Sequence, residues 1–375
     1  MALTVALLAS FEHSFELLEA WDRLAVAAQR PHSAPAWLAA WWQHLSVPGM
    51  ELSVITVSDG AALIGILPLF ARGADYTPLG DGLVPVEPLA ARGREAEVGA
   101  AFARALAERR PRPRCIAIET QDDSPDWPAL IGAGWPGGRP PWQTVERVSP
   151  DPRVELGELS FEQWFEEKSS NFRHDVRRKA KRLRKEGGEL RLTDAGSLDV
   201  DVEAFLRLHL HRHPKGSPLS GDGVGAMLRD VGGELLPSGR FRLASLEVNG
   251  ELEAALLLSA AGGRVSAWSS GMGERLARHS PVMHLFVEEI ERMAGLDERT
   301  MDLGPGEYGY KRRLASVEGT LTRTRLFPRG SGHLRSRGRY LLRRGAERAE
   351  LRARERGGRA RRALGGFVGS SDGRR

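Results

Sequence analysis

The stretch LASLEVNGELEAALLLSAAGGRVSAWSSG, residues 243–271, decides the fold class of this chain. It holds three apolar runs, joined first by Asn249-Gly250 and then by Gly262-Gly263. Both dipeptides tolerate the positive φ angles of tight hairpin turns. The stretch therefore predicts three consecutive antiparallel strands, a β-meander with at least one face in a core.

A similar order of elements occurs earlier in the chain. Residues 51–73 predict two strands around an Asp-Gly turn, followed by a helix over 93–110 and a strand over 114–120. A helix and a strand at 300–304 follow the meander in the same way, and helical segments precede each hairpin. Because the two halves share little sequence identity, the pattern indicates a duplication of topology.

Length and composition predict two globular domains. The chain has 375 residues, of which 41% are apolar and 27% are charged. The Pro-marked segment that begins at Ser149 is the expected boundary between the domains. We predict an α/β fold with mixed sheets, in which residues 1–150 form the first domain, 151–328 the second, and 329–375 an Arg-rich tail.

The tail carries 15 arginines against four acidic residues, a net charge of +11, whereas the whole chain carries +5. The body is therefore net acidic, and the basic character of the chain gives no reason to expect a specific nucleic-acid partner. The composition of the tail favours a disordered or solvated extension, with a thin helix over 339–356. The alternative is a peripheral contact of the tail with an anionic membrane surface.

Cys115 is the single cysteine, so neither a disulfide within the chain nor a cysteine-based metal site can form. This favours a reducing compartment. The first ten residues lack the basic start of a signal peptide, and no apolar run reaches the roughly 20 residues that span a bilayer. We expect a cytoplasmic protein, at most peripheral at the inner membrane face, and the excess of arginine over lysine is typical of bacterial coding bias.

Residues 172–185 predict a helix with two different faces. Eight Arg or Lys residues lie between Arg173 and Lys185. They leave one apolar face, formed by Phe172, Val176, Ala180 and Leu183. The helix is either solvated and amphipathic or a basic wall facing a phosphorylated donor or acceptor, with Arg173 and Arg177 as candidate contacts.

Another helix is predicted to begin at Ser280-Pro281. Serine caps helices, and proline suits the first helical position, where its missing N–H is not needed. The expected buried seam is Val282, Phe286, Ile290 and Met293. Because the helix follows a strand and a loop, its free N–H groups could bind phosphate.

Polar residues crowd the Gly-Pro-Gly turn that follows the strand at 300–304. They are Asp302, Glu307, Tyr308, Tyr310 and Lys311. Glycines let a ligand approach the backbone closely, and open α/β folds place their chemistry at strand ends. We therefore treat these five as candidate site residues, against the alternative of an exposed turn.

Three histidines alternate in LHLHRHP, residues 208–214. Helical spacing puts His209 and His213 on one face, and His211 off it. Two histidines without a nearby third ligand do not make a zinc site, so we expect no metal. A role for one histidine as a base or a substrate contact fits the pattern better.

The order of these motifs resembles that of the CelD/BcsL-type acetyltransferases of the GNAT superfamily, which are related in fold to the Fem aminoacyltransferases. The resemblance covers residues 158–315, through FEQWFEEKSSNFRHDVRRKAKRLRKEGG, FLRLHLHRH, GRFRLASLEVNGELEAALLLSA, HSPVMHLFVEEIERMAGL and MDLGPGEYGYKRRL. In the first half, PAWLAAWWQHL and AALIGILPLF are similar to the family's degenerate partner domain.

The resemblance implies two tandem GNAT-like domains without a metal. It also implies transfer of an acyl group from acetyl-CoA or another acyl-CoA to an amine or hydroxyl of a polar metabolite or cell-envelope glycan. The strand that carries Trp268, Ser269 and Ser270 would part from the strand at 300–304, and the arm of the donor would lie in the gap. Together with Ser280 and Lys311, these residues are the expected donor contacts.

Acyl transfer needs a base for the proton of the acceptor and an acid for the leaving thiolate. It also needs a hydrogen-bond donor for the oxyanion. Tyr308 or Tyr310 is the candidate acid, and His209 or Glu307 is the candidate base. Asp302 matches the aspartate that the family carries at this strand end.

Two alternatives stay open. The donor could be aminoacyl-tRNA, as in the Fem enzymes, which the basic helix at 172–185 would suit, although the sequence contains no inserted helical arm of the Fem kind. The chain could instead be a non-catalytic assembly or regulatory module with a GNAT fold.

Overall fold

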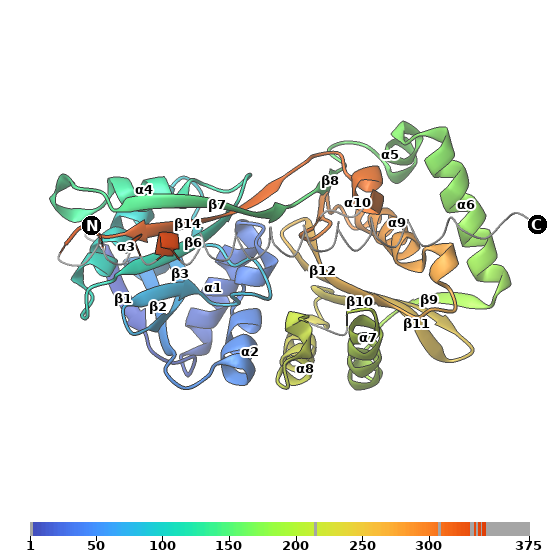
Figure 1. Ribbon diagram of the computed structural model, residues 1–375, viewed down its shortest axis with the longest axis horizontal. Helices are drawn as coiled ribbons and strands as arrows, with labels where there is room; N and C mark the ends of the chain where they lie inside the picture. Colours follow the sequence, from blue (N-terminus) through green and yellow to red (C-terminus); the bar gives the residue numbers. More distant parts are fainter. Residues whose placement is uncertain are drawn as a thin grey trace, which may run out of the picture.

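The structure is a computed structural model and describes residues 3–213, 216–306, 309–330, 334, 337–338 and 340–342. Its strands form two sheets that lie next to each other along the long axis of the molecule (Figure 1). Helices pack on both sheets. The fold is therefore mixed α/β, as the sequence predicts.

The first sheet has eight strands in the order β1-β2-β3-β4-β6-β14-β7, with β5 paired to β3. Its strands are β1 (Thr4–Leu8), β2 (Glu51–Asp59), β3 (Ala62–Arg72), β4 (Asp75–Pro78), β5 (Leu89–Ala90), β6 (Cys115–Gln121), β7 (Trp142–Pro150) and β14 (Thr320–Phe327). The α-helices of this half are α1 (Phe15–Ala27), α2 (Pro35–Leu45), α3 (Glu95–Glu108) and α4 (Trp127–Ala133).

The second sheet has six strands in the order β8-β13-β12-β11-β10-β9. They are β8 (Arg153–Glu155), β9 (Gly188–Leu192), β10 (Phe241–Val248), β11 (Glu251–Ala261), β12 (Arg264–Met272) and β13 (Thr300–Asp302). The α-helices of this half are α5 (Phe161–Glu167), α6 (Ser170–Lys185), α7 (Leu198–Arg212), α8 (Val224–Leu235), α9 (Pro281–Gly295) and α10 (Gly309–Leu314).

The predicted β-meander is confirmed as β10, β11 and β12, which pair antiparallel in sequence order. Both turns use the expected residues, with positive φ angles of 55° at Asn249 and 84° at Gly250. Gly262 and Gly263 have φ angles of 59° and 87°. Turn chemistry therefore fixes the register of the sheet that carries the site.

The predicted duplication of topology is also confirmed. In each half an antiparallel hairpin leads to a strand, a helix and a second strand that pairs parallel with the first: β4 with β6, and β12 with β13. The sequence pattern missed β4, which spans only four residues. The chain therefore contains two halves of similar topology in tandem.

Strand β14 returns from the second half of the chain to the first sheet. It pairs antiparallel with both β6 and β7. The sequence analysis placed residues 320–327 within the range of the second domain, whereas in the structure they complete the sheet of the first. The chain thus crosses between the sheets twice, once after β7 and once before β14.

The two faces of the second sheet are covered by different helices (Figure 1). Leu243 and Leu257 share a core with residues of α7 and α8. Ala244 and Leu256 share a second core with residues of α6 and α9. Because neighbouring residues of a strand point to opposite faces, α7 and α9 lie on opposite sides of the sheet.

The local predictions for α6 and α9 are largely confirmed. The four apolar residues predicted for each helix are buried. The predicted side-chain cap at Ser280 is wrong, since this residue has φ 52° and caps no N–H of α9. Its hydroxyl instead accepts a hydrogen bond from Lys179 Nζ (3.0 Å).

Most of the predicted tail lies outside the described residues, including nearly all of the helix expected over 339–356. None of the helices within the described ranges combines the length and the apolar character that crossing a bilayer demands. Cys115 lies in β6, as expected, and burial raises the pKa of its thiol to about 12, which disfavours the thiolate.

The two halves share one of the hydrophobic cores. Trp37 of α2 donates a hydrogen bond from its indole N–H to Ser259 Oγ of β11 (2.9 Å). The C-terminal end of α2 also meets the start of α8 so closely that a Cβ on Gly223 would lie 2.1 Å from the carbonyl oxygen of His44. The domains therefore form a packed unit.

A methyl group at this contact should loosen the domain interface. We expect Gly223→Ala to lower the free energy of unfolding by about 1–3 kcal/mol, because the backbone of α2 cannot yield as a side chain could. Gly233→Ala is the matched control on the same helix, since a Cβ there meets nothing within 4 Å. The control should raise stability by roughly 0.5–1 kcal/mol. Equal urea midpoints for the two variants would contradict the contact.

Candidate functional site

The site lies where two parallel strands part. β12 and β13 pair over three residues only, from Arg264 opposite Thr300 to Ser266 opposite Asp302. Beyond this point β12 continues to Met272, whereas β13 ends. None of the described strands therefore pairs with this edge of β12 after Ser266, and the backbone groups along it face a gap.

A bulge lies in the same part of β12. Leu257 of β11 is opposite Ser269, and Leu258 is opposite Ala267, so Trp268 is the extra residue. A bulge bends its strand and redirects side chains, and bulges are frequent beside active sites. Its position bends β12 at the point where the strand loses its parallel neighbour.

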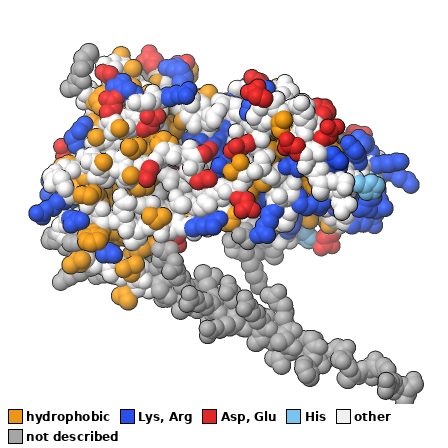
Figure 2. Space-filling model, turned by 90° about the horizontal axis from the view of Figure 1, so that it is seen from above, with side chains coloured by type: hydrophobic (Ala, Val, Ile, Leu, Met, Phe, Trp, Pro, Cys, Tyr) orange, Lys and Arg blue, Asp and Glu red, His pale blue; other side chains and the backbone are white. Residues whose placement is uncertain are grey.

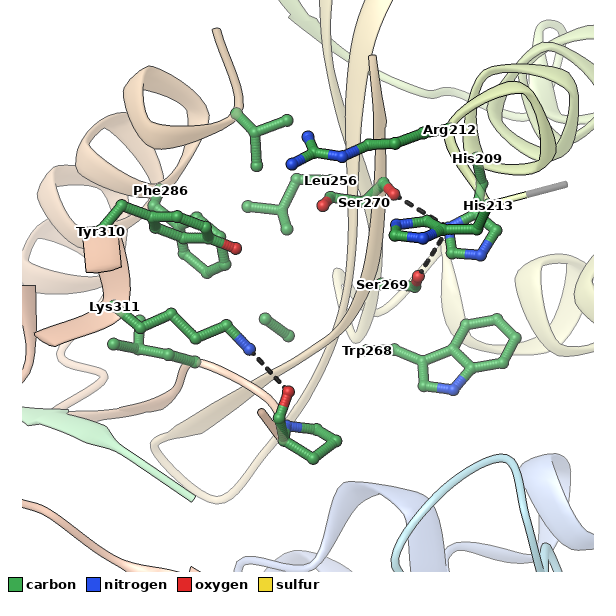
Figure 3. A pocket seen from close by; sticks show the side chains of 14 residues that line it. His209, Arg212, His213, Leu256, Trp268, Ser269, Ser270, Phe286, Tyr310 and Lys311 are labelled. Carbon is green, nitrogen blue, oxygen red and sulfur yellow. Dashed lines mark hydrogen bonds between the residues drawn. The ribbon is translucent and has the colours of Figure 1, made fainter. Parts of the chain in front are cut away.

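A cavity of about 140 Å³ lies in the gap (Figure 3). It is lined by residues from both sides of the sheet. They are His209, Arg212, His213, Leu256, Ala267, Trp268, Ser269, Ser270, Val282, Phe286, Leu303, Pro305, Tyr310 and Lys311. The gap that the sequence analysis expected is thus a cavity that joins the α7 side of the sheet to the α9 side.

The α9 side of the cavity carries an amine and a phenol. The ring of Tyr310 packs against Phe286, with centroids 5.7 Å apart, and its hydroxyl points into the cavity (Figure 3). Lys311 is buried and donates hydrogen bonds to the carbonyl oxygens of Gly304 (2.8 Å) and Pro305 (2.9 Å). Burial lowers the pKa of Lys311 to about 8, against the opposing effect of the Asp151 carboxylate.

The α7 side carries a histidine whose tautomer is defined by its contacts. His209 Nδ1 lies 2.9 Å from the carbonyl oxygen of Ser270, which can only accept, so this nitrogen carries the proton. Nε2 then accepts a hydrogen bond from Ser217 Oγ (2.8 Å). Burial lowers the pKa of His209, so the ring is neutral near pH 7 and has the protonation state of a base.

The first domain holds one wall of the cavity. Trp268 donates its indole N–H to the carbonyl oxygen of Leu83 (2.8 Å). Its ring also makes an edge contact with Trp37, with centroids 5.6 Å apart. The bulged residue of β12 is therefore fixed by two residues of the other half of the chain.

Asp302 does not line the cavity. It is buried and accepts hydrogen bonds from Arg264 Nε (2.8 Å) and Nη2 (2.5 Å) and from Ser266 Oγ (2.5 Å). Arg264 also pairs with Asp123 of the first domain (2.5 Å). The structure thus places Asp302 in an ion pair at the base of the gap, where its contacts are those of a residue that positions β12 and β13.

The residues expected to bind phosphate or substrate lie outside the cavity. Ser280 stands at the start of α9 beside Lys179. Arg173 donates to the carbonyl oxygen of Glu166 (2.7 Å), and Arg177 lies over the ring of Phe165. Figure 2 shows that basic side chains gather at the end of the molecule that α6 occupies.

Six of the candidate residues meet in this one cavity: His209, Trp268, Ser269, Ser270, Tyr310 and Lys311. Glu307 and Tyr308 lie outside the described residues. The sequence analysis missed Arg212 and Phe286 as site residues. Helical spacing could have found Arg212, because it follows His209 by three residues, close to one turn. Within the described ranges no group of three or more His, Cys, Asp or Glu side chains could hold a metal ion.

The family profile described as "Acetyltransferase (GNAT) domain" matches residues 170–312. This span contains both parted strands and every lining residue of the cavity. The second half of the chain therefore has the fold of a GNAT acetyltransferase domain. A comparison with curated proteins gave no match.

Three solved structures resemble nearly the whole chain. FemX has a TM-score of 0.60 at 10% identity, over 91% of this chain and 99% of that chain. L-PGS from Bacillus licheniformis has a TM-score of 0.57 at 12% identity, over 86% and 95%. The C-terminal domain of a putative lysylphosphatidylglycerol synthetase from Agrobacterium fabrum has a TM-score of 0.54 at 12% identity, over 82% and 91%. At these identities the likeness concerns the fold.

The buried amine predicts a specific dependence of stability on pH. Between pH 8 and 10.5 the unfolded chain holds a proton on Lys311 that the folded chain has lost, so stability rises with pH in this window. Relative to Lys311→Met, the wild type should gain about 3 kcal/mol of unfolding free energy across it. Urea unfolding at both ends of the window measures the gain, and a constant difference would show that the amine titrates normally.

Proposed function

We propose that the chain is an acyltransferase, which moves an acyl group from acyl-CoA to an amine or hydroxyl. Acetyl is the preferred acyl group, and the acceptor is a polar metabolite or a cell-envelope glycan. The observation that carries the proposal is the cavity between the parted strands β12 and β13, with a neutral histidine on one side and an amine and a phenol on the other.

The donor would enter from the α9 side. Its arm would run along the unpaired edge of β12, where Trp268, Ser269 and Ser270 offer backbone and side-chain polar groups. The phosphates would then lie near the start of α9, where free N–H groups provide partial positive charge and Lys179, which also pairs with Asp175 (3.0 Å), stands beside Ser280. This placement supports acyl-CoA as the donor.

The chemistry would proceed by direct transfer. The nucleophilic nitrogen or oxygen of the acceptor attacks the thioester carbonyl carbon, and the C–S bond breaks as the tetrahedral intermediate collapses. The proton of the acceptor passes to His209 Nε2, through the hydroxyl of Ser217 that this nitrogen already binds. The leaving thiolate takes a proton from Tyr310 or from Lys311, which stands on the opposite wall.

The Lys311 ammonium would also stabilise the oxyanion. A cation in a water-poor cavity stabilises developing negative charge more strongly than it would in water. Because its pKa lies near 8, the same group can return a proton at neutral pH. Asp302 would act through Arg264 and Ser266, which it binds, and would not touch the substrate.

Aminoacyl-tRNA is the second candidate donor. Two observations favour it: the exposed basic face of α6, and the likeness of the fold to FemX and to lysylphosphatidylglycerol synthetase domains. The basic face would attract a large polyanionic donor that lies across the end of the second domain.

A module without catalysis is the third candidate. We also propose that the chain is of the CelD/BcsL type and that it is cytoplasmic. A contact of its tail with an anionic membrane surface is a further proposal.

Calorimetry with acetyl-CoA and longer acyl-CoAs tests the first candidate. We expect saturable binding by the wild type and weaker binding or turnover by Lys311→Met, because the variant loses the cation on the α9 side of the cavity. Lys185→Met, at the exposed end of α6, is the control and should behave as the wild type.

Absence of heat with every acyl-CoA would end the first candidate. A salt-dependent gel shift with tRNA, lost when Arg177, Arg178 and Lys181 are reversed to glutamate, would then establish the second.

A further inference from the structure

We propose that the acceptor carries a carboxylate or phosphate group, which Arg212 binds at the α7 side of the cavity. The inference rests on the proposed function, because it assigns the α9 side of the transfer site to the donor and the α7 side to the acceptor. It narrows the acceptor from any amine or hydroxyl to one that also bears an oxyanion.

Arg212 is placed to bind a ligand. It lies in the last turn of α7, and its guanidinium extends from the helix into the cavity (Figure 3). Its side chain is exposed, and within the described part of the chain no carboxylate forms an ion pair with it.

The charge of the cavity selects for an anion. Arg212 and Lys311 face it from opposite walls, and Lys311 is mostly protonated at pH 7 because its pKa is about 8. None of its described lining residues is acidic. A guanidinium binds a carboxylate or a phosphate through two parallel hydrogen bonds, so it selects the ligand by the geometry of its oxygen atoms as well as by its charge.

The position of Arg212 assigns the anion to the acceptor. Lys179 and Ser280, which would face the phosphates of the donor, lie on the α9 side of the sheet. Arg212 belongs to α7, which covers the opposite face. Because the cavity passes through the sheet where β13 ends, the two substrates can approach from opposite faces and meet at the gap.

The cavity that Arg212 and His209 share limits the size of the acceptor. Both side chains come from the C-terminal part of α7 and line one cavity of about 140 Å³. An oxyanion on Arg212 and a nucleophile beside the base at His209 can therefore belong to one small molecule. Short amino acids and amino phosphates fit this volume, with the amine as the nucleophile.

Ligand-observed NMR with two matched probe pairs tests the inference. One pair is 4-aminobutyrate and its neutral amide, and the other is O-phosphoethanolamine and ethanolamine. We expect the wild type to bind the anionic member at least about tenfold more tightly, the value of one good charged hydrogen-bonding contact. Arg212→Gln should remove the preference, and Arg212→Lys should restore part of it. The pair with the stronger preference distinguishes a carboxylate from a phosphate acceptor.

Arg207→Gln is the matched control, because Arg207 is an exposed arginine of the same helix that does not line the cavity. It should keep the preference. A preference that is absent from the wild type, or that survives in Arg212→Gln, overturns the inference. If acyl-CoA binds in calorimetry on the same samples, the proposed function then still stands. If acyl-CoA does not bind while the preference depends on Arg212, the proposed function fails, and with it the assignment of the anion as acceptor.

Discussion

The site depends on a short parallel strand pair that ends at a buried ion pair. Arg264 and Asp302 are almost inaccessible to solvent, and their side chains join β12 to β13 diagonally, from the first pair of the ladder, Arg264 opposite Thr300, to the last, Ser266 opposite Asp302. Removing one partner of such a pair leaves a buried charge and costs about 3–5 kcal/mol. Directly after it, Gly304 turns away with φ 77°, and a Cβ there would lie 2.6 Å from the carbonyl oxygen of Ala267. The strands are thus held together up to one point and then separate.

The first domain stabilises β12 through contacts that cross the domain boundary. Asp123 extends the ion pair across the domain boundary to Arg264, and Arg30 holds Asp123 in turn (3.0 Å). The carbonyl oxygen of Leu83 fixes Trp268 at the bulge. The first half therefore supports the cavity of the second half from outside. The core that α2 and α8 share holds the two halves in a fixed relative position.

The sequence predicted the features that local chemistry determines. The hairpin turns at Asn249-Gly250 and Gly262-Gly263 and the buried seams of α6 and α9 follow from residues within one turn or one helix. Five of the six candidate residues in the cavity come from two short segments, 268–270 and 310–311, whose order along the fold brings them together.

The features that the sequence analysis missed depend on long-range contacts. Nothing in residues 320–327 indicates that they pair with β6, about 200 residues earlier in the chain. Asp302 looked like a site residue because it stands at the end of a strand, but its partner Arg264, and Asp123 that pairs with Arg264, are distant in sequence. The side chain of Ser280 does not cap α9, because its backbone is left-handed with φ 52° and its hydroxyl binds Lys179 of another helix.

A crystal structure with a non-hydrolysable acetyl-CoA analogue tests the central claim most directly. The account predicts electron density for the arm of the analogue between β12 at residues 267–270 and the turn at 303–305, with the reactive carbon between His209 and Lys311. An analogue bound elsewhere, or a gap closed by side chains from the α7 and α9 faces, would contradict it.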